Sequence, residues 1–131
     1  MSLLSQIIDG AHYGNKVKIE KGGDQRDDII YTKDVAFGIY LACIAPEPKH
    51  NAYNIGSGKG YTFNDVADQV RQIIPEADIE IGPGLHFWEG PTHYYSVYDI
   101  GRARADLGFS PQFTLKEAIE DYLGILEKLG Q

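Results

Sequence analysis

The chain has 131 residues, 43% of them hydrophobic and 24% charged, which is an ordinary balance for a single globular domain with its own core. Its net charge of −7 argues against nucleic acid as a partner, because phosphate contacts need lysine and arginine gathered on one face. The longest apolar run, residues 35–46, is too short to cross a bilayer, so no membrane partner is expected. A single cysteine, Cys43, excludes an internal disulfide and indicates a reducing, cytoplasmic location.

The first third of the chain predicts a mixture of helices and strands. Leu3–Ile8 is typical of the end of a helix, and Val17–Gly22 alternates like a strand. The polar residues of Gly22–Asp28 predict a turn, and the apolar stretch Ile29–Thr32 predicts a buried strand. We expect Asp34 to cap a following helix, whose apolar residues recur with the helical period.

The middle of the chain predicts a strand, a glycine-rich loop and a helix. Tyr53–Ile55 is the strand, and GSGKG is the loop. Thr62 is expected to cap the helix, with Asp65 at the second position of a capping box. Another strand follows at Ile79–Ile81.

A short helix and a last helix are predicted near the C-terminus. Asp99 is expected to cap the first, and Gly108 to end it. Thr114 and Glu117 have the spacing of a capping box before the second helix. Because strands and helices alternate along the chain, the predicted fold class is α/β.

The glycine-rich loop has the layout of a phosphate-binding loop, in which backbone N–H groups hold the anion. Its details differ from one. Lys59 is followed by Gly60 rather than by serine or threonine, and none of the fifteen glycines forms a GxGxxG or GxxGxxG pattern. We therefore expect this loop to turn the chain without binding a nucleotide.

Three stretches nevertheless carry a family resemblance. They are GGDQRDDIIYTKDVAFGI, YNIGSGKGYTFNDVADQV and YDIGRARADLGFSPQF, in this order along the chain. Together they resemble elements near the end of extended short-chain dehydrogenase/reductases of the NAD-dependent (sugar-nucleotide) epimerase/dehydratase family. The third stretch has Gly101 where the family usually has serine.

The resemblance implies that residues 1–131 are one domain, the C-terminal substrate-binding part of an extended Rossmann-type fold without the NAD(P)-binding region. The family's catalytic Tyr-x-x-x-Lys is also missing, because none of the nine tyrosines has lysine four residues later. No catalytic residue is therefore predicted, since nothing provides the tyrosinate base and its lysine. NAD or NADP is expected in a parent protein, and no cofactor is expected on this chain alone.

By the same resemblance, Arg26 is a candidate to hold the diphosphate of a nucleotide sugar, a task suited to a guanidinium. Counting back from Asp34 without a gap places Asp27 at that position, so Arg26 fits only if the strand has a bulge. The alternative is a solvated loop arginine. Glu89 lies in the stretch where the family often has a second arginine, and a carboxylate there would repel a diphosphate.

Three other residues complete the candidate site for a sugar-type substrate. Asn54 matches an asparagine that binds the nucleotide portion in the dehydratases, with a bond to nearby backbone as the alternative. His86 and Trp88 belong to an aromatic loop that suits either a sugar pocket or an interface. No metal site is expected, because His86 and His93 lack supporting carboxylates.

Two functions remain open from the sequence. The chain is either the substrate-binding C-terminal fragment of an NAD(P)-dependent sugar epimerase/dehydratase, inactive alone, or a free-standing, non-catalytic binding or oligomerisation module derived from that fold. In both cases we expect a homo-oligomer, because a truncated sheet leaves strand edges and apolar helix faces exposed.

Overall fold

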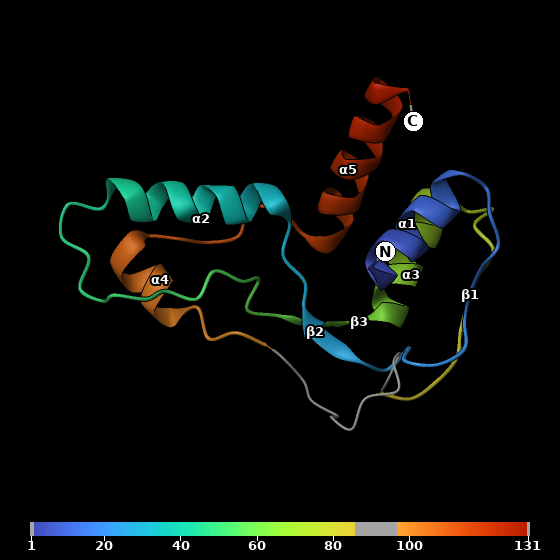
Figure 1. Cartoon of the computed structure of the whole chain (residues 1–131), viewed down its shortest axis with the longest axis horizontal. Coiled ribbons are helices and arrows are strands. Elements are labelled where there is room, and N and C mark those ends of the chain that lie inside the picture. Colours follow the sequence, from blue (N-terminus) through green and yellow to red (C-terminus); the bar gives the residue numbers. More distant parts are fainter. Residues whose placement is uncertain (1, 86–96, 131) are drawn as a thin grey trace.

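The computed structural model describes residues 2–85 and 97–130, and Figure 1 shows how their helices and strands are arranged. The helices are Leu3–His12 (α1), Thr32–Ile44 (α2), Phe63–Ile73 (α3), Gly101–Leu107 (α4) and Leu115–Leu129 (α5). The strands are Val17–Ile19 (β1), Arg26–Asp28 (β2), Gly60–Thr62 (β3) and Ile79–Ile81 (β4).

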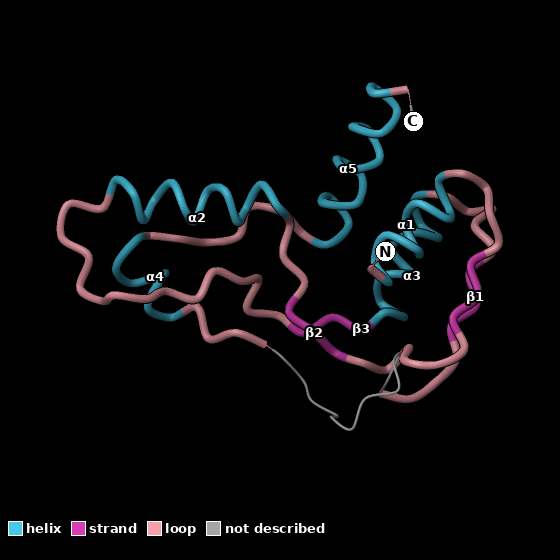
Figure 2. Tube along the Cα trace, viewed as in Figure 1, coloured by secondary structure: helices cyan, strands magenta, loops and turns pink. Residues whose placement is uncertain are grey.

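The strands of the described residues form two separate pairs (Figure 2). Each strand has three residues. β1 and β4 are parallel, with Val17 opposite Ile79. β2 and β3 are antiparallel, with Arg26 opposite Thr62 and Asp28 opposite Gly60. The second pair joins the first half of the chain to the start of α3, next to the glycine-rich loop.

The larger hydrophobic core lies between α1, α3, α5 and the β1–β4 pair. Each helix contributes one apolar face, as its sequence predicts. Capping boxes begin α3 and α5: the Thr62 and Thr114 side chains accept hydrogen bonds from the third residue of each helix, and Asp65 and Glu117 bond back to the caps. The buried residues of this core are Ile7, Ala11, Val17, Ile19, Phe63, Val66, Ala67, Val70, Ile79, Ile119, Leu123 and Leu126.

A smaller core lies between α2 and α4. In Figure 1 these two helices lie on one side of α5, and α1 and α3 lie on the other. Phe109 is fully buried there, and Tyr53 and Ile55 pack against the same cluster. Gly38 lets α2 approach this segment, because a Cβ atom at residue 38 would lie 2.8 Å from Cγ2 of Ile55. A larger residue at position 38 would push α2 away from its neighbour.

The α2 helix leaves an apolar face exposed. Ile39, Tyr40 and Ile44 are each more than half exposed, at 57%, 57% and 56%. They lie at the spacing of one helical face, so they form a single apolar surface rather than scattered contacts. None of the helices in the described part of the chain is long and apolar enough to span a membrane.

Two predicted strands, Ile29–Thr32 and Tyr53–Ile55, were wrong, and Thr32 is instead the first residue of α2. Residues 29–31 and 53–55 have no strand partner within the described residues, whereas Arg26–Asp28, predicted as a turn, forms β2. Composition signals that a segment suits an extended form, but a strand exists only where a second segment supplies hydrogen bonds. The strand predicted at Val17–Gly22 is confirmed over Val17–Ile19, and the one predicted at Ile79–Ile81 is confirmed in full.

Asp34 and Asp99, predicted as helix caps, are not the N-cap residues of α2 and α4. α2 begins at Thr32, so Asp34 lies inside its first turn, and its buried carboxylate accepts hydrogen bonds from the N–H groups of Gln112 (2.8 Å) and Phe113 (3.3 Å). Asp99 lies two residues before α4, and Oδ1 of its side chain accepts the N–H of Gly101 at 2.7 Å. Both carboxylates still bind backbone donors, and Asp34 thereby joins α2 to the start of α5.

Candidate functional site

The glycine-rich loop is held by the carboxylate of Asp28. Oδ1 accepts hydrogen bonds from the N–H (2.6 Å) and the hydroxyl (2.7 Å) of Ser57. Oδ2 accepts the N–H groups of Gly58 (2.9 Å) and Tyr98 (3.1 Å). Gly58 has a φ of 66°, a conformation that glycine adopts without strain. One side chain on β2 therefore fixes both the loop and the segment that starts at residue 97.

This arrangement takes up the amides that would otherwise face an anion. The N–H groups of Ser57 and Gly58 point at Asp28, and the N–H of Lys59 donates to the Ser57 hydroxyl at 3.1 Å. An internal carboxylate thus occupies the position that a phosphate takes in a nucleotide-binding loop. The geometry agrees with the sequence-based expectation that this loop turns the chain.

Arg26 lies on the same face of β2 as Asp28, because side chains alternate along a strand. Its aliphatic stem covers Gly60: a Cβ atom there would lie 2.6 Å from Cγ and Cδ of Arg26 and 2.9 Å from Cγ2 of Val97. Arg26 is exposed and forms no ion pair within the described residues. The pairing of β2 with β3 contains no bulge. If the chain has one residue more than the family pattern between Arg26 and Asp34, that residue lies after β2.

Asn54 is exposed, and its amide Nδ2 donates to the carbonyl of Asp99 at 3.0 Å. Asn54 therefore bonds to backbone, as the alternative expected, but to a residue 45 positions further along the chain. Asn54 thus borders residue 99, while Arg26 and Val97 both approach Gly60. The structure places these two candidates at the two ends of residues 97–99.

His86 and Trp88 lie outside the described residues, so their predicted role stays a prediction. The described residues before and after 86–96 are both hydrogen-bonded to residues 24–28. The N–H of Gly84 donates to Asp24 at 2.7 Å, and the N–H of Tyr98 donates to Asp28. The two acceptors, Asp24 and Asp28, lie on either side of Arg26 in the sequence.

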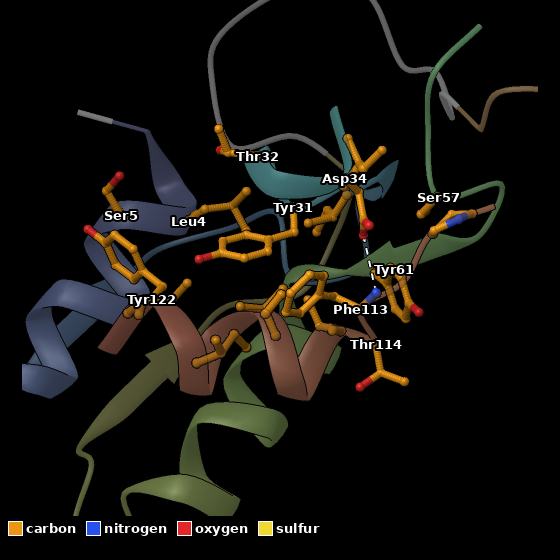
Figure 3. A pocket seen from close by; sticks show the side chains of 18 residues that line it. Leu4, Ser5, Tyr31, Thr32, Asp34, Ser57, Tyr61, Phe113, Thr114 and Tyr122 are labelled. Atoms are coloured by element: carbon orange, nitrogen blue, oxygen red, sulfur yellow. Dashed lines mark hydrogen bonds between the residues drawn. The ribbon is translucent and has the colours of Figure 1, made fainter. Parts of the chain in front are cut away.

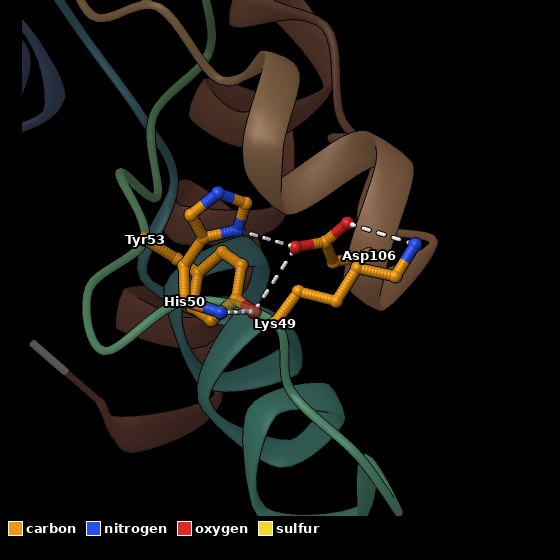
Figure 4. Close-up of polar contacts among 4 residues, drawn as sticks. All are labelled: Lys49, His50, Tyr53 and Asp106. Atoms are coloured by element: carbon orange, nitrogen blue, oxygen red, sulfur yellow. Dashed lines mark hydrogen bonds and ion pairs between the residues drawn. The ribbon is translucent and has the colours of Figure 1, made fainter.

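A polar cluster that the sequence did not reveal joins the loop after α2 to α4 (Figure 4). Nδ1 of His50 lies 2.6 Å from Oδ2 of Asp106, and the Tyr53 hydroxyl donates to the same oxygen at 3.2 Å. The backbone N–H of His50 donates to the Tyr53 hydroxyl at 3.0 Å. The hydrogen bond with His50 is the largest cause that lowers the pKa of Asp106. His50 and Asp106 are 56 residues apart, so no local motif marks this cluster.

Tyr31, which the sequence suggested as a packing residue, packs edge-on against Phe113 with ring centroids 5.0 Å apart. Its hydroxyl donates to Asp121 at 2.6 Å, and Lys33 forms an ion pair with the same carboxylate at 2.6 Å. Burial, followed by the hydrogen bond to Asp121, raises the pKa of Tyr31 to about 12. No group of three or more histidine, cysteine or acidic side chains suited to a metal ion occurs among residues 2–85 and 97–130.

Comparison with known proteins identifies the fold. No protein-family model matches the sequence. The ADP-L-glycero-D-manno-heptose-6-epimerase of Fusobacterium nucleatum is 27% identical over 114 residues, which cover 79% of this chain and 33% of that protein. The UDP-glucose 4-epimerase structure from Thermotoga maritima aligns with 99% of this chain and 40% of its own, at a TM-score of 0.80 and 24% identity.

A dTDP-glucose 4,6-dehydratase structure from Bacillus anthracis aligns with 97% of this chain and 39% of its own, at a TM-score of 0.77 and 18% identity. The chain has the fold of one part of the NAD-dependent epimerases and dehydratases. Its α/β class and the resemblance to this family are thereby confirmed. The chain spans about a third of the length of the curated relative and about two fifths of these structures.

We predict that Asp28→Asn lowers the free energy of unfolding by about 2–3 kcal/mol, because an amide cannot accept all the N–H groups that converge on this carboxylate. Urea unfolding at neutral pH measures the loss. The matched control is Asp27→Asn on the opposite face of β2, for which we expect a change below about 1 kcal/mol. Equal losses for both variants would contradict the assigned role of Asp28.

We also predict a fall in stability at acid pH that depends on Asp106. Its pKa is lowered in the folded state, so its contribution is complete above the ordinary aspartate value of about 4 and is lost as the pH falls through the lower folded value. Unfolding curves at neutral pH and at about pH 3 should therefore differ less for Asp106→Asn than for the parent chain. An unchanged acid response would show that the His50 contact does not stabilise the charged form. Exposed Asp68 is the control position, as Asp68→Asn.

Proposed function

We propose that residues 1–131 form the C-terminal, substrate-binding part of a cytoplasmic NAD(P)-dependent epimerase or dehydratase that acts on a nucleotide sugar. The sequence motifs and the shared fold support this proposal. NAD or NADP is bound elsewhere in such an enzyme, and this chain supplies contacts to the substrate. Structures with the same fold include the Thermotoga maritima epimerase with UDP-glucose and a Bordetella bronchiseptica enzyme in complex with NAD⁺ and UDP.

The observation that carries this proposal is the position of Arg26. Its exposed guanidinium has no ion pair in the described part of the chain, and its stem is fixed over a residue without a side chain. A planar guanidinium can bind two oxygens of a diphosphate at once. Because Asp28 already occupies the loop amides, the phosphate-binding task falls to a side chain rather than to the glycine-rich loop.

Three other residues complete the proposed site. Asn54 has an exposed amide at the other end of residues 97–99 and suits the nucleotide portion. Trp88 and His86 complete the proposal as stacking and hydrogen-bonding partners of the sugar. Without the Tyr-x-x-x-Lys pair and the dinucleotide loop, the chain alone neither binds NADH nor turns over substrate.

The second candidate function is a free-standing, non-catalytic binding or oligomerisation module. The exposed face of α2 favours it, because Ile39, Tyr40 and Ile44 leave a continuous apolar surface. Under either function we expect two copies to associate through this surface, since burial of three large apolar side chains is favourable.

A titration with UDP-glucose and NADH tests the first function. We predict that the chain binds UDP-glucose and shows no saturable binding of NADH in calorimetry. Arg26→Ala should weaken UDP-glucose binding by about 1.5–3 kcal/mol, because a charge-assisted contact to phosphate is lost. Trp88→Ala should cost about 1–3 kcal/mol through lost stacking.

The matched control for the charge is Arg104→Ala, at an exposed position on α4, which should leave the affinity unchanged. Equal affinities of the parent chain and the Arg26 variant would place the phosphate site elsewhere. Saturable NADH binding in the micromolar range would overturn the assignment of the cofactor to another part of a parent enzyme.

Light scattering tests the association. We predict a mass above that of one chain at high concentration, and a shift toward a single chain for Ile39→Glu, because a buried unpaired carboxylate is costly. Gln72→Glu, exposed on α3, adds the same charge away from the α2 face and should leave the mass unchanged. A monomeric parent chain at every concentration would refute self-association.

A further inference from the structure

A cavity of about 230 Å³ lies between α1, the start of α5 and residues 29–32 (Figure 3). Neither Arg26 nor Asn54 lines it, whereas Ser57 of the glycine-rich loop and Tyr61 of β3 do. An engineered cavity of about 150 Å³ is enough to hold benzene. This space is therefore suited to a molecule of one or two small rings.

Apolar and aromatic side chains form most of the wall. Leu4 and Ile8 of α1 and Ala118 of α5 are among the residues that line it. The rings of Tyr31 and Phe113 meet edge-on, which gives a flat ligand both ring faces and ring edges to contact. Such a wall favours a planar apolar molecule over a flexible polar one.

Two tyrosine hydroxyls give the cavity a hydrogen-bonding preference. The Tyr31 hydroxyl donates to Asp121 (2.6 Å), and the Tyr122 hydroxyl donates to Asp9 (2.9 Å). In Figure 3 both rings line the cavity on the side of α1. Each hydroxyl has one proton, which its carboxylate already accepts, so each oxygen offers only lone pairs to a ligand. A molecule that brings an N–H or O–H donor is complementary to this arrangement.

The charges around the cavity oppose an anion. Asp9 and Asp121 accept the tyrosine protons, and the buried carboxylate of Asp34 also lines the space. Lys33 forms an ion pair with Asp121, and its Nζ lies 5.9 Å from the centres of the Tyr31 and Phe113 rings. Burial and hydrogen bonding raise the pKa of Tyr31 and of Tyr122, so both phenols stay protonated near neutral pH.

We propose that this cavity binds a small, neutral aromatic molecule that carries one N–H or O–H donor, of the indole or phenol class. The ring fills the apolar space, and the donor bonds to a tyrosine oxygen. Carboxylates and phosphates of the same size are excluded by the surrounding acids. This site is independent of the nucleotide-sugar proposal, which requires a cation.

Three probes of similar shape test the proposal in titrations followed by backbone amide NMR. Indole should bind with a submillimolar dissociation constant and shift the signals of α1 and of the first turns of α5. Indene, which has the same ring shape without the N–H, should bind about tenfold or more weakly. Indole-2-carboxylate should not bind. Equal affinity for indole and indene would refute the role of the tyrosine oxygens, and equal affinity for the carboxylate would refute the charge argument.

Variants locate the site. Ala118→Leu fills the cavity and should abolish indole binding, whereas Ala42→Leu, at an exposed position on α2, makes the same change without effect. Tyr31→Phe keeps the ring and removes one acceptor, so it should weaken indole and leave indene unchanged. If Ala118→Leu unfolds the chain, Ser5→Leu at the cavity edge replaces it. Unchanged indole binding in a folded cavity-filling variant would overturn the proposal.

Discussion

The carboxylate of Asp28 is the contact on which the arrangement of the candidate site depends. Asp28 lies on β2, and its two oxygens bind the glycine-rich loop and residue 98, which are 29 and 70 residues further along the chain. Three segments that are distant in sequence therefore meet at one carboxylate. A charged acceptor that receives several N–H groups holds them more firmly than neutral hydrogen bonds would. The position of Arg26, two residues earlier on the same strand, follows from this anchor.

The same contact divides the surface into regions with opposite electrostatic preferences. Because Asp28 accepts the N–H groups of the loop, these groups are not available to an anion, and the nearby guanidinium of Arg26 is the group suited to bind one. The cavity beside α1 has the reverse character, since Asp9, Asp34 and Asp121 surround apolar walls. The two proposals therefore assign a diphosphate and a neutral aromatic donor to different places, a distinction that the net charge of −7 alone does not reveal.

Two features of the structure fit a chain that corresponds to about two fifths of the length of related folds. Residues 29–31 and 53–55 are suited to strands by composition but have no strand partner among the described residues. The α2 helix, between them in sequence, packs one face on Ile55 and leaves the opposite one exposed. An apolar helix face and an unpaired extended segment are both stabilised by a further layer of structure.

Local features were determined by the sequence itself. The capping boxes at Thr62 and Thr114, the glycine that ends α4 and the apolar faces of α3 and α5 depend on residues within a few positions of one another, so their spacing reveals them. The resemblance of three motifs also predicted the fold class and the candidates Arg26 and Asn54. Only the tertiary structure decided that Asp28 holds the glycine-rich loop, that Asp34 joins α2 to residues 112–113, and that His50 meets Asp106. These contacts join residues 29 to 79 positions apart, and a carboxylate has no local signal that distinguishes a solvated side chain from one that accepts distant backbone donors.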